Sequence, residues 1–272
     1  MIVNMMNNGI IDFHAHAFPD ALAPRAMKKL LEESPGVQAF LDGTLKSLTE
    51  SMDRNGIDKS VICCIATSPD QFTPIFNWCK KVQASRLIMF PSIHPADSQW
   101  KEHISLIKHA GFKGVKFHPY YQVFRLDENR MLKIYEQLEQ NDLIVVAHTG
   151  FDIAFPRDAR ADCRTILKVT EMFPHLKFVT THLGAWQQWD DVEQLLAGKH
   201  IYMDLSWSLE CLPPEQAKRI MLAHPSDCVL FGTDSPWTDQ ARTLSLLKDL
   251  KLPHELESNI LHNNAMALLG LI

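Results

Sequence analysis

The sequence predicts an α/β fold, a single (β/α)8 barrel of the TIM type, and two observations lead to it. Eight short apolar runs rich in β-branched residues recur along the chain, and segments with helical periodicity lie between them. Most of these runs are apolar throughout, which is typical of parallel strands covered on both faces. A doubly wound open sheet is the alternative. It would need a glycine-rich phosphate turn after the first strand, and DFHAHAFP is not one.

The eight runs give the predicted strands in chain order. They lie at 10–16, 60–66, 86–93, 112–118, 143–149, 177–183, 200–206 and 228–234. Predicted helices lie near 38–55, 70–83, 97–109, 161–173, 188–197, 214–223 and 238–249. One more helix follows an N-cap at Asp127, because apolar residues recur there at i, i+3, i+4 and i+7. A long loop at about 17–37 follows the first strand, and an extra C-terminal helix at about 255–268 completes the outer layer.

Composition and charge exclude several classes of protein. We expect one domain over residues 1–272, because no tract rich in Gly, Ser or Pro divides them. The net charge of −5 and the scattered Lys and Arg residues argue against nucleic acid as a partner. No apolar run approaches the roughly 20 residues of a membrane span, and the start MIVNMMNNG lacks a targeting signal. We therefore expect a cytoplasmic protein with no membrane partner, and six cysteines that are reduced and mostly buried.

Polar side chains stand at the C-terminal ends of the predicted strands. They are His14, His16, His94, Lys116, His118, His148, His182 and Asp234. In a barrel these ends meet on one face, where the loops after the strands build the active site. His14 and His16 are two residues apart, so in a strand they point to the same side and can bind one ion. Imidazoles with a carboxylate such as Asp234 suit a divalent metal and leave a position for water.

Six motifs together resemble the amidohydrolase superfamily, in the branch that includes the aminocarboxymuconate-semialdehyde decarboxylase-like enzymes. They are DFHAHAFP, GFKGVKFHP, VVAHTG, VTTHLG, FGTDSPW and NILHNNAMALLGL, and they span about residues 10–270. The resemblance implies that the ligands of one divalent metal ion are His14, His16, His148 and Asp234. It also implies that His182 contacts the metal-bound water or the substrate.

The metal expected from this resemblance and from the ligand types is zinc, with manganese, iron or nickel as alternatives. Two-metal members of the superfamily carry a carboxylated lysine or a glutamate at strand four, where this chain has Lys116. A carbamate on Lys116 that bridges two ions is therefore an alternative, although the KFHP setting is more similar to the one-metal branch. The relatives also make a homodimer an expectation.

Hydrolysis of an amide, ester or lactone bond in a small organic substrate is the first function expected. A divalent cation lowers the pKa of bound water to about 7 and so activates it. Asp234 would be the general base, and His182 would stabilise the oxygen charge that develops. The alternative is non-oxidative decarboxylation of an aromatic or unsaturated carboxylic acid by the same residues. A barrel that only binds a partner would have lost ligands, and here all are present.

Both reactions require residues that bind a small, anionic substrate. The cationic candidates are Lys116 and Arg25, with Arg125 and Arg157 as further ones. Aromatic residues that follow strand ends are candidates for pocket walls, namely Phe18, Tyr120 and Trp186, together with Tyr121 and Trp207. His94 and His118, each followed by proline, are candidate substrate contacts. The other seven histidines receive no function.

Overall fold

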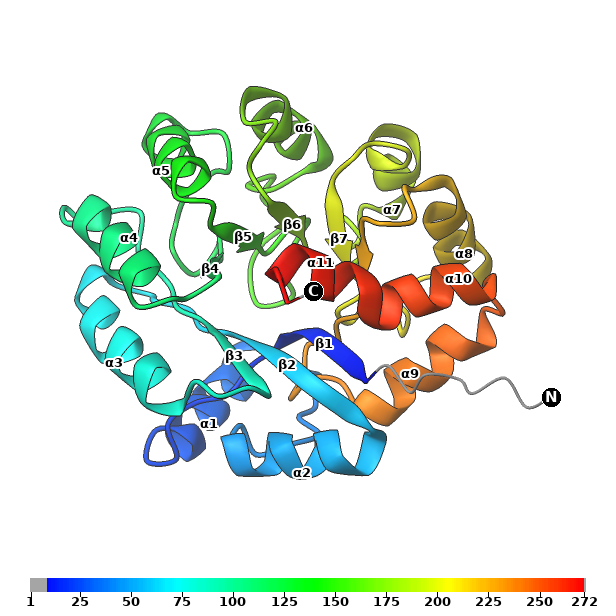
Figure 1. Cartoon of the computed structure of the whole chain (residues 1–272), viewed down its shortest axis with the longest axis horizontal. Helices are drawn as coiled ribbons and strands as arrows, with labels where there is room; N and C mark the ends of the chain where they lie inside the picture. Colours follow the sequence, from blue (N-terminus) through cyan, green and yellow to red (C-terminus); the bar gives the residue numbers. More distant parts are fainter. Residues whose placement is uncertain (1–8, 272) are drawn as a thin grey trace.

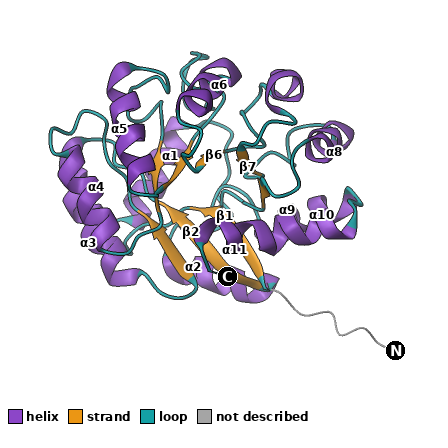
Figure 2. Ribbon diagram, turned by 45° about the horizontal axis from the view of Figure 1, so that its top comes forward, coloured by secondary structure: helices purple, strands orange, loops and turns teal. Residues whose placement is uncertain are grey.

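Eight short parallel strands form a barrel at the centre of the molecule, and helices surround it (Figures 1 and 2). The computed structural model describes residues 9–271, so the predicted features of residues 1–8 and 272 lie outside it. The strands are β1 Ile10–Ala15, β2 Ile57–Cys63, β3 Leu87–Phe90, β4 Gly114–Phe117, β5 Ile144–Ala147, β6 Phe178–Thr180, β7 Tyr202–Asp204 and β8 Val229–Leu230. Strands are separated by helices, which confirms the predicted (β/α)8 fold.

Backbone hydrogen bonds close the barrel at its two weakest seams. The continuous ladders run β1-β2-β3 and β4-β5-β6-β7-β8. Between β3 and β4, Lys116 N donates to Pro91 O at 3.0 Å, and between β1 and β8, Phe13 N donates to Phe231 O at 2.7 Å. The strands are shorter than predicted at their C-terminal ends. After β6 and β8 the backbone turns left-handed at His182 and Asp234, with φ of 60° and 69°, and leaves the ladder.

The helices form the outer layer. They are α1 Ala23–Glu33, α2 Leu45–Asn55, α3 Phe72–Val82, α4 Trp100–His109, α5 Asn129–Gln140, α6 Cys163–Met172, α7 Trp189–Asp191, α8 Pro214–Ala223, α9 Gln240–Asp249, α10 His254–Ser258 and α11 Asn264–Leu269. A 3-10 turn at Pro69–Gln71 precedes α3, and π-helical turns at Val192–Leu196 and Asn259–Asn263 follow α7 and α10.

Three helix predictions need correction. The predicted loop at 17–37 contains α1, whose first turn carries Pro24 and whose remaining residues are mostly good helix formers. The helix predicted at 38–55 begins only at Leu45, where the Thr44 side chain accepts from Ser47 N as the N-cap. The helix after Asp127 begins two residues later, with Glu128 at the N-cap position. For α2 and α5 the apolar pattern located the helix better than its first residue, whereas α1 was missed.

The apolar core has two parts. The larger part lies between the strands and the outer helices, and the smaller part fills the barrel itself. Ile11 and Phe13 of β1 belong to the inner part, together with Leu268 and Leu269 of α11. The extra C-terminal helix therefore covers one end of the barrel, inside the ring of helices (Figure 1). The functional groups lie at the opposite end, where the strands terminate.

Two further expectations concern composition. All six cysteines are free. Cys211 is exposed, and the other five are buried. Within residues 9–271, no helix combines the length and apolar character that crossing a bilayer requires.

Gly150 tests how tightly the loops above the barrel are packed. Its φ is +86°, and an added Cβ would lie 2.0 Å from Trp186 N and 2.5 Å from Trp186 O. We expect Gly150→Ala to lower the free energy of unfolding by about 3 kcal/mol or more, the sum of a left-handed alanine and overpacking. Gly111 is the matched control, because its φ is +81° and nothing lies within 4 Å of a Cβ there. Urea unfolding that shows equal losses for Gly150→Ala and Gly111→Ala would contradict the packing argument.

Candidate metal centre

Three side chains from the first and last strands converge above the barrel. The Nε2 atoms of His14 and His16 are 3.2 Å apart, and Asp234 Oδ1 lies 3.4 Å from the first and 3.0 Å from the second. Asp234 N donates to His14 O at 2.8 Å, which holds the ends of the two strands together. The register of β1 shifts between Asp12 and Ala15, so that the inner face can include both Phe13 and His14. These three residues form a set of metal-ligand atoms in the described chain.

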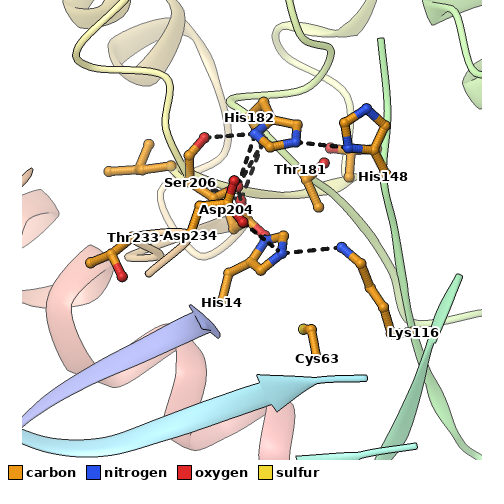
Figure 3. Close-up of polar contacts among 12 residues, drawn as sticks. His14, Cys63, Lys116, His148, Thr181, His182, Asp204, Ser206, Thr233 and Asp234 are labelled. Carbon is orange, nitrogen blue, oxygen red and sulfur yellow. Dashed lines mark hydrogen bonds and ion pairs between the residues drawn. The ribbon is translucent and has the colours of Figure 1, made fainter. Parts of the chain in front are cut away.

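Hydrogen bonds behind the rings decide which imidazole nitrogens face the centre as lone pairs. His14 Nδ1 lies 2.8 Å from Asp204 Oδ2 (Figure 3), and His16 Nδ1 lies 2.8 Å from Cys63 O. Both partners are acceptors, so each Nδ1 carries the proton and each Nε2 presents a lone pair. Two lone pairs and a carboxylate oxygen within 3.4 Å repel one another unless a cation lies between them. The donor set therefore fits a divalent metal ion.

A second pair of rings is arranged in the same way. His148 Nε2 donates to Phe151 O at 2.9 Å, and His182 Nδ1 donates to Ser206 O at 2.8 Å. The remaining nitrogens, His148 Nδ1 and His182 Nε2, face each other at 3.0 Å as acceptors (Figure 3). Neither ring belongs to the His14, His16 and Asp234 set, within which the ligand atoms lie at most 4.8 Å apart. In this structure His148 thus contacts His182 and is not one of the three residues of the His14, His16 and Asp234 set.

Lys116 places a positive charge inside the site. Its Nζ donates to His14 Nε2 at 3.1 Å (Figure 3), and its side chain is 1% exposed. The ammonium points to the same lone pair that a metal ion would use. A salt bridge to Asp234 is not among its contacts in the described residues.

Burial keeps the rings neutral and the carboxylate ionised. Desolvation, reinforced by Lys116, lowers the pKa of His14 to about 4. Desolvation likewise lowers the pKa of His148 and of His182. For Asp234, burial raises the pKa, but the neighbouring His14 and His16 outweigh it and hold the pKa far below its usual range. Neutral imidazoles and an ionised carboxylate are the forms that bind metals.

A second group of possible ligands lies beside the first. His118 Nε2 and His148 Nε2 lie 3.3 Å and 3.6 Å from Asp152 Oδ2, and the two rings stack with centroids 4.2 Å apart. His148 already uses Nε2 to donate to Phe151 O, so it cannot offer that nitrogen to a cation as well. We therefore interpret Asp152 as an acceptor that orients the two rings.

The predicted substrate residues fall into three places. A small cavity of about 110 Å³ above the metal set is lined by Lys116, His118, Phe18 and Trp186. A larger adjoining cavity is lined by Phe18, Tyr120 and Arg25. His94 lines neither cavity, and its Nδ1 accepts from Ala96 N at 3.1 Å. The Tyr120 hydroxyl donates to Gly150 O at 2.9 Å and is thus engaged in holding a loop.

Several functional residues escaped the sequence interpretation. Asp204 orients His14 and is 0% exposed, and it ends β7 just as the predicted ligands end their strands. Treating strand seven like the others would have found it. Ser206 and Asp152 orient rings from positions that no sequence pattern marks. Trp237 joins Trp186 and Trp207 in the walls of the small cavity, directly after the FGTDSP motif.

Comparison with known proteins places this geometry in a family. The chain matches the sequence model of the amidohydrolases over residues 11–271. No curated protein matches it significantly. An uncharacterized TIM-barrel protein from Bordetella bronchiseptica has a similar structure, with a TM-score of 0.75 and 20% sequence identity, and the match covers 96% of this chain and 98% of that one.

Two decarboxylases share the fold at lower identity. For 2,6-dihydroxybenzoate decarboxylase from Rhizobium the TM-score is 0.68 at 14% identity, over 97% of this chain and 99% of that one. For 5-carboxyvanillate decarboxylase from Novosphingobium aromaticivorans the TM-score is 0.71 at 13% identity, over 98% and 97%. That structure was determined with manganese and 4-hydroxy-3-methoxy-5-nitrobenzoic acid bound.

The barrel and its His/His/Asp set define an enzyme with a site suited to a divalent metal ion. The chain belongs to the amidohydrolase family. This membership confirms the resemblance to the amidohydrolases seen in the six motifs.

The buried rings predict that acid destabilises the metal-free protein. His14 has a folded pKa of about 4 against an ordinary value of 6.5, so the unfolded chain binds more protons between these pH values. The free energy of unfolding should therefore fall as the pH falls from 6.5 to 4, by about 3 kcal/mol for His14 alone. Urea unfolding across this range measures the slope. His14→Gln should flatten it and His175→Gln, at an exposed ring, should not; equal slopes in all three proteins would contradict the assignment.

The hydrogen bonds of Asp204 predict that its substitution weakens metal binding. Its Oδ2 accepts from His14, while its Oδ1 accepts from Ser206 N at 3.0 Å and from His182 N at 3.3 Å. An amide cannot accept on both sides, so Asp204→Asn should weaken metal binding about 10- to 100-fold. Competition with a chromophoric chelator measures the affinity, with Asp249→Asn at an exposed carboxylate as the control. Equal affinities for the two variants would show that Asp204 does not orient a ligand.

Proposed function

We propose that this enzyme is a metal-dependent, non-oxidative decarboxylase of a small, flat aromatic or unsaturated carboxylic acid. One observation carries the proposal. The small cavity beside the metal set combines the buried Lys116 ammonium with walls of aromatic rings, from Phe18, Tyr121, Trp186, Trp207 and Trp237. Such a cavity suits a planar ring that bears a negative charge. The two decarboxylases that share the fold act, by their names, on acids of this kind.

We assign the metal to His14, His16 and Asp234, with His148 as the further ligand that the family resemblance implies. Nitrogen and carboxylate ligands suit manganese as well as zinc, and manganese is the ion bound in the Novosphingobium aromaticivorans structure. When bound, the ion supplies a Lewis acid that polarises substrate oxygens and offsets negative charge. The one-metal arrangement is the one we propose, because the KFHP setting of Lys116 is similar to the one-metal branch.

The surrounding residues supply the remaining requirements of the reaction. Lys116 attracts the carboxylate of the substrate into a cavity of low polarity, where the attraction is stronger than in water. The aromatic walls hold the ring flat and exclude water. As the carbon–carbon bond to the carboxylate breaks, its electron pair stays on the substrate carbon, which must then gain a proton. We assign that proton transfer to Asp234 and His182, since both line the cavity; the ionised Asp234 would first take up a proton from solvent and then deliver it to the carbon.

Hydrolysis, the first function expected from the sequence, uses the same residues with water as the nucleophile. The cavity supports decarboxylation more than hydrolysis, because many of its walls are rings that suit a flat substrate and its Lys116 ammonium suits an anion. The similar structures support the same choice.

Release of carbon dioxide tests the proposal directly. Protein loaded with manganese or zinc is incubated with a panel of hydroxybenzoates and unsaturated acids, and carbon dioxide is measured. Asp234→Asn should keep the fold and lower kcat by about 10²- to 10⁴-fold, the usual contribution of a positioned acid or base. Asp249→Asn is the control at an exposed carboxylate. Turnover of esters or lactones without any release of carbon dioxide would favour hydrolysis instead, and full activity of Asp234→Asn would remove Asp234 from the mechanism.

A further inference from the structure

A second cavity of about 1040 Å³ adjoins the small one and has no role in the chemistry proposed above. The two cavities share five lining residues, which are His16, Phe18, Leu30, Ile65 and Tyr121. A ligand at the metal centre can therefore extend past these side chains into the larger space. We refer to this larger space as the outer chamber.

The sizes of the two cavities differ too much for a single-ring substrate to explain both. An apolar cavity of about 150 Å³ holds one benzene ring, so the small cavity of about 110 Å³ accommodates no more than one flat head group. Pockets for whole drug-sized ligands span about 300–1,000 Å³. The outer chamber is at the upper end of that range by itself.

Two helices line the outer chamber with apolar residues. Leu22, Ala26 and Leu30 follow one another at four-residue spacing along α1 and line the chamber. The residues that α1 buries are instead Ala23 and Met27. From the other side, Ile75 and Trp78 of α3 line the chamber at three-residue spacing. The stripes do not pack against each other, and the space between them is the chamber.

The remaining walls make the chamber a hollow rather than a flat surface. Cys63, Cys64 and Ile65 line it at the end of β2, and Tyr120 and Tyr121 line it after β4. The charged lining residues are Arg25, Lys29 and Glu33 of α1, and all three are exposed to solvent. Charge thus lies where the chamber meets water, while the buried part of its wall is apolar.

We propose that the substrate carries a large apolar extension, an alkyl chain or a second ring system, that lies in the outer chamber. The identity of the head group rests on the proposed function; the extension rests on the chamber itself. Each methylene group moved from water into the chamber should tighten binding about fourfold. The chamber would then select among acids that share the same head.

Binding of an alkyl series tests the proposal. The probes are 2-hydroxybenzoate and its 4-alkyl and 5-alkyl homologues from methyl to hexyl, titrated calorimetrically into the metal-loaded protein. We expect Kd to fall about fourfold per methylene in at least one series. A Kd that stays constant in both series would overturn the proposal, as would a chamber filled by a second copy of the chain, seen as dimer dissociation on adding the hexyl compounds.

Variants that fill the outer chamber test where the alkyl chain of the probe binds. Ala26→Trp, from α1, and Ile75→Trp, from α3, should each abolish the dependence on chain length and leave the Kd of 2-hydroxybenzoate within twofold. Lys28→Trp places the same ring on α1 away from the chamber and should keep the dependence, since Lys28 is 78% exposed and does not line it. Circular dichroism and metal content confirm that each variant folds. If one of the two chamber-filling variants does not fold, the other still tests the proposal. Chain-length dependence that survives in both would place the alkyl group elsewhere and overturn the proposal.

Failure of this inference and failure of the proposed function are distinguishable, because the titration requires no turnover. If Kd depends on chain length but no acid releases carbon dioxide, the inference about the outer chamber stands and the proposed decarboxylase function fails. Release of carbon dioxide with no chain-length dependence would do the reverse.

Discussion

The site depends on where the imidazole protons are held. Fixed acceptors behind the rings, which are Asp204, Cys63 O, Phe151 O and Ser206 O, take the N–H of His14, His16, His148 and His182. Every ring therefore turns a lone pair to the interior, and burial disfavours protonation of His14, His148 and His182. The acceptors come from the barrel strands and the loops that follow them. The barrel thus does more than bring histidines together, because it also fixes the tautomer of each.

The repeated structure of the fold made it accessible from the sequence. Eight apolar runs and the helical periodicity between them located every strand and most helices, since burial on both faces of a parallel sheet leaves a continuous pattern. The errors lie where burial is not the determinant. The main apolar stripe of α1 lines a cavity instead of the core, and residues 17–37 were therefore predicted as a loop. Strand ends were placed too late at β6 and β8, which end at Thr180 and Leu230, before the left-handed residues His182 and Asp234.

The candidate site was predictable to the extent that its groups stand at strand ends. His14, His16 and Asp234 come together as expected, because one barrel end collects all strand termini. The separation of His148 from that set depends on ring orientation, which Asp152 and Phe151 O influence and which no residue spacing encodes. Asp204 was predictable on the same ground, because it is the last residue of β7. The outer chamber lies between α1 and α3, and the spacing of these helices is a tertiary property that local sequence does not carry.

The covering of the barrel by α11 also bears on how the chain folds. Ile11 and Phe13 of the first strand share the inner core with Leu268 and Leu269, so contacts distant in sequence complete the barrel. Such contacts form slowly because long loops must close first. During synthesis the first strand emerges long before its partners in β8 and α11, and its apolar face stays open for that time. The segment carrying His14 and His16 is thus made long before β8 and α11 and is among the last to be enclosed.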